Sequence, residues 1–215
     1  MRRYFLLVVC LCLASLLRAQ NKLELISPNG ELKVSLNLSD KIYYSIDYNG
    51  DVLLKDNTLQ LTLRNQVLGQ NPKLRRQKRT SVDEQLTPIV PLKYAKVNNR
   101  YNQLLLTFKD YSVEFRAFDD GVAYRFITSQ KGDVEVMNEF AINFPSDYLL
   151  HLQQPGGFHT AYEEPYTHVQ SNAWKPEERI AVLPVLIDTQ KDYKILISES
   201  DLTDYPCMFL KGTGT

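Results

Sequence analysis

Few residues of this sequence have the type and spacing that chemistry requires. Two adjacent acidic pairs, Glu163-Glu164 and Glu177-Glu178, come closest to a carboxylate dyad. Neighbouring residues of a strand point to opposite faces, so the two carboxylates of either pair cannot both reach the same substrate bond. A hydrolytic pair of carboxylates must face each other about 5 to 10 Å apart across the scissile bond. Nothing in the sequence fixes such a pair, and we assign no catalytic residue to this chain.

The three histidines, His151, His159 and His168, do not have the spacing of a zinc motif and have no cysteine pair nearby. We interpret them as loop or surface residues. His159 or His168 with Glu163 could form the acid–base pair of a mutarotase-like epimerase. Nothing in the sequence orients such a pair, so this hypothesis ranks last.

An aromatic segment covers residues 158–176, where Tyr162, Tyr166 and Trp174 lie among polar residues and prolines. Aromatic rings stack on sugar faces while neighbouring polar groups bind hydroxyls. This composition makes Tyr162 and Trp174 candidate substrate-binding residues, as in a non-catalytic carbohydrate-binding module. The alternative is a long loop packed by its own aromatic side chains, and the sequence leaves both interpretations open.

Glu199 is a more specific candidate, because it follows an expected strand at residues 193–198. A carboxylate at a strand end has a rigid support, and hard cations such as calcium prefer oxygen ligands. Calcium takes six to eight ligands, so one carboxylate does not make a site. Taken alone, Glu199 would be an ordinary exposed acid.

The N-terminus has the pattern of a secretory signal peptide over residues 1–19: Arg2 and Arg3, then an apolar run to Leu17, then Ala19. About fourteen apolar residues are too few to span a bilayer comfortably, so we expect no stable membrane anchor.

Cleavage would remove three of the 25 basic residues and leave a net charge of −3, that is 22 against 25 acidic residues. Only Cys207 would remain of the three cysteines, and we expect a secreted protein of the periplasm of a Gram-negative bacterium.

The charge balance argues against a nucleic-acid partner, because 25 basic and 25 acidic residues give a formal charge of zero. A basic run at residues 73–79 is followed by Asp83 and Glu84 and contains no aromatic residue. We therefore interpret residues 64–91, which are polar and contain three prolines, as a solvated loop.

Alternation of apolar and polar residues predicts strands along the rest of the chain. The clearest cases are residues 32–38, 44–48, 59–63, 104–108 and 113–117, with further short strands at 52–54, 122–126, 134–136, 140–144, 180–183, 185–187 and 193–197. The dipeptide Asn49-Gly50 predicts a tight hairpin, and Asp119-Asp120-Gly121 predicts a turn. Ten or more short strands without interspersed helices predict an all-β, antiparallel sandwich.

Four segments occur in an informative order: SPNG at residues 27–30, NRYNQL at 99–104, FRAFDDGVAYRF at 115–126 and ISESDLTDYPCM at 197–208. Together they resemble the N-terminal region of glycoside hydrolase family 97, which includes α-glucosidases and α-galactosidases of Bacteroides-type bacteria. The resemblance covers nearly all of residues 23–215. It implies a β-supersandwich of the galactose mutarotase-like kind over residues 20–215, and we expect its last strands to lie beyond Thr215.

The same resemblance implies a catalytic (β/α)8 barrel after the sandwich and a calcium ion beside the barrel's catalytic glutamates. One calcium-binding glutamate of the family comes from the N-terminal domain, and its motif matches Glu199 with Asp201, Leu202 and Tyr205. We therefore expect Glu199 to bind calcium shared with the barrel. The expected substrate is an α-linked oligosaccharide, and residues 20–215 alone should be inactive.

Overall fold

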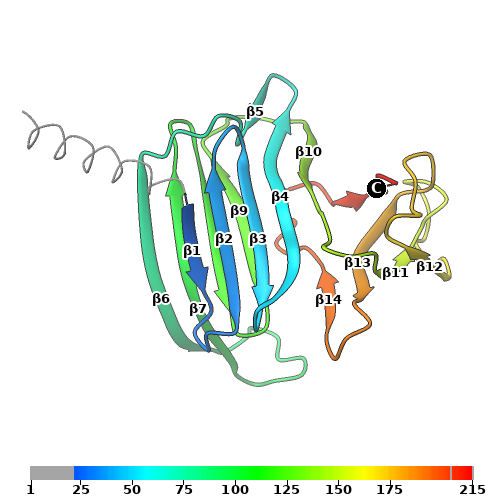
Figure 1. Ribbon diagram of the computed structural model, residues 1–215, viewed down its shortest axis with the longest axis horizontal. Helices are drawn as coiled ribbons and strands as arrows, with labels where there is room; N and C mark the ends of the chain where they lie inside the picture. Colours follow the sequence, from blue (N-terminus) through cyan, green and yellow to red (C-terminus); the bar gives the residue numbers. More distant parts are fainter. Residues whose placement is uncertain (1–21, 204, 215) are drawn as a thin grey trace, which may run out of the picture. The chain divides into compact units, whose positions relative to one another are not determined.

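The computed structural model describes residues 22–203 and 205–214, and within them it contains strands and turns but no helix (Figure 1). This confirms the all-β prediction. The described residues divide into two compact units, one ending at Pro145 and one beginning at Ser146. The expected signal peptide, residues 1–19, lies outside the described residues. In the part that is described, no helix is long and apolar enough to cross a membrane.

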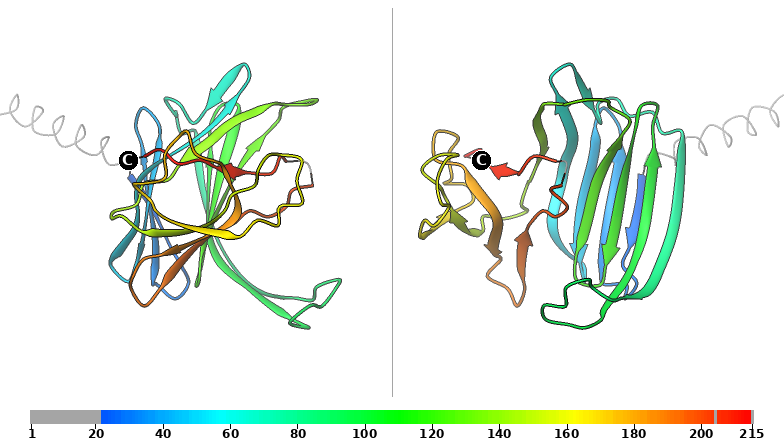
Figure 2. Two further views of the ribbon diagram at one scale, coloured as in Figure 1. Left: turned by 90° about the vertical axis from the view of Figure 1, so that its right-hand side faces the viewer. Right: turned by 180° about the vertical axis from the view of Figure 1, so that it is seen from behind.

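The first unit is a sandwich of two antiparallel sheets (Figures 1 and 2). One sheet has the order β1-β2-β3-β4-β10, with β5 added to β4; the other has the order β6-β7-β8-β9. The first sheet consists of β1 (Lys22–Ile26), β2 (Leu32–Leu38), β3 (Ile42–Tyr48), β4 (Asp51–Leu63), β5 (Gln66–Leu68) and β10 (Val136–Ala141). The second consists of β6 (Arg76–Leu86), β7 (Val97–Thr107), β8 (Tyr111–Phe118) and β9 (Val122–Thr128).

The core of this unit lies between the two sheets and follows directly from the alternation in the sequence. In β2 the leucines and the valine are buried, while the residues between them are more exposed. Opposite them lie fully buried side chains of the second sheet, among them Leu104, Leu106 and Phe115. Such alternation is typical of sheets with one face in the core and one toward water.

Two turns confirm the sequence prediction. Asn49 and Gly50 both have positive φ, 50° and 87°, and they join β3 to β4 as a type I′ hairpin turn requires. Residues 119–121 close β8 onto β9, where the Phe118 N–H donates to the Gly121 carbonyl over 2.8 Å. The two strands expected at residues 52–54 and 59–63 are one strand, β4, with an irregularity beside Asp56, whose φ is 49°.

The expectation of a solvated loop over residues 64–91 is wrong for residues 66–68, which form β5 with Leu68 buried, and for most of the second half. Residues 76–86 form β6, an edge strand that pairs with β7 along its whole length. Most of its side chains are exposed on both faces, so the sequence has no apolar period to detect. The expectation that these residues are polar and solvated still holds. Figure 2 shows the β6–β7 hairpin extending past its neighbouring strands.

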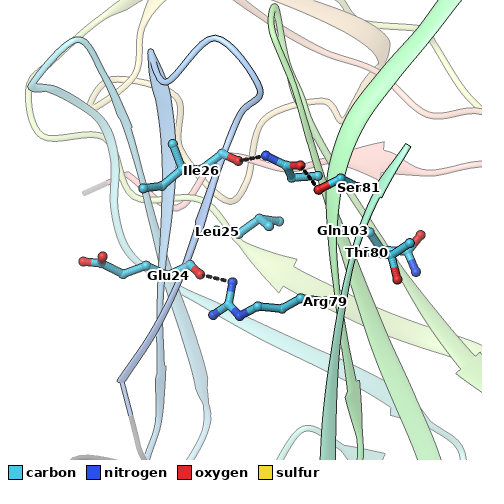
Figure 3. Close-up of a pocket in the computed structure, with 8 residues that line it drawn as sticks. Glu24, Leu25, Ile26, Arg79, Thr80, Ser81 and Gln103 are labelled. Atoms are coloured by element: carbon cyan, nitrogen blue, oxygen red, sulfur yellow. Dashed lines mark hydrogen bonds between the residues drawn. The ribbon is translucent and has the colours of Figure 1, made fainter. Parts of the chain in front are cut away.

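Side chains of the second sheet cap the open edge of β1. Arg79 Nη1 donates to the Glu24 carbonyl over 2.7 Å, and Asn102 Nδ2 donates to the Ile26 carbonyl over 2.8 Å (Figure 3). Between them lies an open groove of about 520 Å³ lined also by Thr80. Unpaired strand edges invite association with other chains. Because Arg79 and Asn102 occupy two backbone carbonyls of β1, we interpret the groove as the capped edge of the sandwich.

Tyr44 should make the free energy of unfolding of this unit depend on pH in the alkaline range. Burial raises the pKa of its phenol to about 12, although a hydrogen bond with Asn57 acts in the opposite direction. The unfolded chain loses this proton near the ordinary tyrosine value of 10, so stability falls as pH rises from about 10 to 12 and then levels. Two pKa units correspond to about 2 to 3 kcal/mol. Urea unfolding at about pH 9 and about pH 11 covers half of this range and should show a loss of about 1 to 1.5 kcal/mol from Tyr44. Tyr44→Phe should reduce the total loss without removing it, because burial also raises the pKa of Tyr111; an equal loss in that variant would contradict the assignment.

The second unit is a five-stranded antiparallel sheet in the order β12-β11-β13-β14, with β15 also paired to β13. Its strands are β11 (Leu149–Gln153), β12 (Tyr166–Gln170), β13 (Ala181–Asp188), β14 (Lys194–Ile197) and β15 (Phe209–Leu210). One face buries Leu150, Leu152, Val185 and Ile187. The strand β12 lies inside the segment that the sequence indicated as a loop.

Candidate functional site

Glu199 lies just after β14, in a stretch that leads to β15. Both strands pair with β13, β14 through residues 185–188 and β15 through residues 181–182. The stretch therefore begins and ends on the same strand. Glu199 is partly exposed.

The carboxylate of Glu199 is held in place by the backbone. Both of its oxygens lie 3.0 Å from the Met208 nitrogen, whose single N–H is shared between them. Asp201 has a positive φ of 62°, which turns the chain immediately after the glutamate. A carboxylate oxygen has further lone pairs after accepting one N–H, so Glu199 remains able to bind a cation.

The described residues do not bring three or more metal-binding side chains together at Glu199 or elsewhere. Within residues 22–203 and 205–214, no three His, Cys, Asp or Glu side chains converge as ligands. A hard cation at Glu199 would need most of its six to eight oxygen ligands from elsewhere. The oxygen donor and its partial exposure fit calcium, and the sequence prediction for Glu199 stays a prediction.

Trp174 is 5% exposed and is packed from several directions. Its indole Nε1 donates to the Arg179 carbonyl over 3.2 Å, and its own carbonyl accepts from the Gly214 N–H over 3.0 Å. Gly212 packs so closely that a Cβ there would lie 2.6 Å from the ring carbon Cγ of Trp174. This geometry favours the packed-loop interpretation for Trp174.

Tyr162 also contacts its own loop. Its hydroxyl donates to the Phe158 carbonyl over 2.7 Å, and its ring centroid lies 6.4 Å from that of Phe209. Phe158 meets the same Phe209 ring edge-on at 5.1 Å. Phe209 directly follows Met208, whose N–H binds Glu199. Sugar binding by Tyr162 remains a prediction.

The sequence analysis missed one arrangement of possible ligands. His151 on β11 and His168 on β12 face each other across the two strands, with their Nδ1 atoms 2.7 Å apart. They lie on strands and not in loops, but both are accessible, so the surface alternative of the sequence interpretation holds for them. The short alternations around each histidine were the available signal, but their separation of 17 residues does not reveal the register.

Solved structures define the class of protein to which this fold belongs. A crystal structure of a β-arabinopyranosidase matches 83% of this chain with a TM-score of 0.73 and 22% identity. A glycoside hydrolase family 97 enzyme from Pseudoalteromonas sp. strain K8, in complex with acarbose, matches 88% with a TM-score of 0.73 and 24% identity. A family 97 enzyme from the same strain in complex with panose also matches 88%, with a TM-score of 0.74 and 23% identity. The fold is that of a sandwich domain found in larger glycoside hydrolases.

Sequence comparison gives the family. Residues 25–215 match the family described as Glycosyl-hydrolase 97 N-terminal, and the chain belongs to it. A retaining alpha-galactosidase of Bacteroides thetaiotaomicron is 35% identical over 221 aligned positions, which cover 97% of this chain. The resemblance noted from the four sequence segments is thus confirmed.

The chain spans about a third of the length of these relatives, 33% of the galactosidase and 30 to 31% of the solved structures. The domain is part of larger enzymes in the relatives.

Proposed function

We propose that this chain is the N-terminal sandwich of a secreted, calcium-dependent α-glycosidase and completes the active site of a following (β/α)8 barrel. The family match over residues 25–215 carries this proposal. The 35% identity to a retaining alpha-galactosidase favours an α-galactoside over an α-glucoside as the substrate. The catalytic acid and base would then belong to the barrel, consistent with the lack of a carboxylate pair in this sequence.

Glu199 would contribute one calcium ligand from this chain. Its position supports the role, because the Met208 N–H orients the carboxylate while leaving lone pairs free. A bound calcium ion would supply positive charge that polarises groups near the scissile bond. The contribution of the chain itself is to orient the carboxylate, through β14 on one side and β15 on the other.

Secretion is a separate part of the proposal and rests on the pattern of residues 1–19. In the periplasm, the enzyme would meet oligosaccharides that have passed the outer membrane. A mature chain that begins at Gln20 would support this location, and mass spectrometry of the protein from the periplasmic fraction measures it. Recovery of the chain only from the cytoplasmic fraction, with residues 1–19 still attached, would contradict it.

The enzymatic prediction concerns the complete protein. It should hydrolyse nitrophenyl α-galactoside faster than the α-glucoside, and removal of calcium with a chelator should lower the rate by on the order of tenfold or more. Added calcium should restore the rate, whereas magnesium should not, because it demands a smaller octahedral site. Full activity after exhaustive chelation would contradict calcium dependence, and failure to cleave either α-glycoside would contradict the proposed function.

The packed-loop geometry of Trp174 does not favour the carbohydrate-binding module as a separate function. The acid–base pair of an epimerase has no support from the arrangement of His168 either, because that ring faces His151. We therefore propose no second function.

A further inference from the structure

The outward face of the second unit's sheet carries a row of side chains that the proposed function does not use. Across β12, β11, β13 and β14, the register places His168, His151, Leu186 and Leu196 side by side. Leu186 and Leu196 are 39% and 61% exposed, and the two histidines are also accessible. This face of the sheet is therefore open to solvent over the described residues that form it.

The two imidazoles converge on one point of this face. Their rings are nearly perpendicular, at 78°, with centroids 4.7 Å apart, and their Nδ1 atoms are 2.7 Å apart. At this distance one Nδ1–H donates to the other Nδ1. Two nitrogen lone pairs therefore aim at nearly the same position once the shared proton moves.

We propose that His151 and His168 form a binding site for a divalent transition metal, with zinc as the representative ion. Neutral imidazole nitrogen is a preferred ligand of zinc, copper and nickel. Zinc–nitrogen bonds of about 2.0 to 2.1 Å in a tetrahedral site require nitrogens about 3.3 Å apart. The Nδ1 atoms reach that separation when the exposed rings turn slightly apart.

The proton balance of binding is simple. The ring that carries its proton on Nδ1 changes to the tautomer with the proton on Nε2, through exchange with water. Both Nδ1 atoms then present a lone pair to the metal, and no net proton is released from the neutral pair. Water would fill the remaining two positions of a tetrahedral site.

Asp188 provides a negative charge on the same face. It lies on β13 two residues beyond Leu186, the partner of His151, so it is the diagonal neighbour of that histidine. Its carboxylate accepts hydrogen bonds from Lys194 Nζ at 2.5 Å and from the Gln190 N–H at 2.7 Å. The hydrogen bonds from Lys194 and from the Gln190 N–H, and more weakly the charges of Lys194 and His151, hold the pKa of Asp188 below its ordinary value.

The metal would link the edge strand β12 to its neighbour β11. In the sheet order, β12 lies outermost and pairs only with β11 among the described strands. A bond between the two histidines through zinc would fix the register His151↔His168. This proposed site is separate from Glu199 and calcium, since calcium prefers oxygen ligands.

The test is zinc titration of the purified chain, followed by the ¹⁵N resonances of the imidazole rings. We expect one equivalent of zinc to shift the Nδ1 resonances of His151 and His168 and to leave His159 unchanged. By calorimetry, His151→Ala and His168→Ala should each weaken zinc binding by on the order of tenfold or more. His159→Ala and Cys207→Ser are the matched controls for the remaining histidine and for the exposed thiol, and neither should change the affinity.

Several outcomes would overturn the site. Unshifted Nδ1 resonances of His151 and His168 at saturating zinc would do so without any variant, whatever the variants' stability. Equal weakening by His159→Ala or Cys207→Ser would place the metal elsewhere. A response of the two rings to calcium as large as that to zinc would also contradict a nitrogen-ligand site.

Discussion

Replacing Leu104 with alanine should lower the free energy of unfolding by about 2 to 5 kcal/mol, the range for leucine removed from a packed core. Leu104 is fully buried in the centre of β7, and it faces the first sheet across the sandwich. Its register neighbours are Arg79 on β6 and Phe115 on β8. These strands hold its backbone in place, so the cavity cannot collapse and the cost lies well above that of an exposed site.

Leu92 provides the matched control for this change. It lies in the connection between β6 and β7 and is 94% exposed, so Leu92→Ala removes the same atoms without opening a cavity. We expect a change within about 0.5 kcal/mol. Urea unfolding of both variants measures the difference, and equal destabilisation would contradict the two-sheet core.

The strands that bury one face could be located from the sequence, although some are longer than predicted, as β7 at residues 97–107 is against the predicted 104–108. The alternation at residues 32–38 matches β2, and Asn49-Gly50 gives the hairpin at the end of β3. These features are local, because a side chain's face and a turn's φ values depend on adjacent residues. The arrangement of the core follows from them.

Edge strands and cross-strand pairs could not be predicted in the same way. β6 is polar on both faces, so no period distinguishes it from a loop. The pairing of His151 with His168 depends on how the connection at residues 154–165 returns the chain. Register is not encoded in either strand alone.

At the candidate site, the sequence indicated which residue to consider but not the groups that surround it. The sequence indicated Glu199 as a strand-end acid, and the family resemblance implied its role. The Met208 N–H that orients it comes from nine residues further along and depends on β15 returning to β13. For Trp174, composition alone could not distinguish an exposed ring that stacks on a sugar from a ring that is buried in its own loop.

Glu199→Gln in the complete enzyme should have the largest effect on function. Glutamine keeps an oxygen that can accept from the Met208 N–H, so the local backbone should be preserved. It removes the negative charge, and calcium affinity depends strongly on the number of charged ligands. We expect calcium binding weaker by on the order of tenfold or more, with a parallel fall in turnover at limiting calcium.

Glu178→Gln is the control, because Glu178 is an exposed acid of the same unit. It should leave both calcium affinity and turnover unchanged. Recovery of turnover in Glu199→Gln at high calcium would indicate that the loss is one of metal binding and not of folding.

The most direct measurement is calorimetric titration of calcium into the complete enzyme and into its Glu199→Gln variant. One high-affinity site in the enzyme, weakened by on the order of tenfold or more in the variant, is the result we predict. Identical calcium affinity in the two proteins would contradict a metal shared between this sandwich and a catalytic barrel.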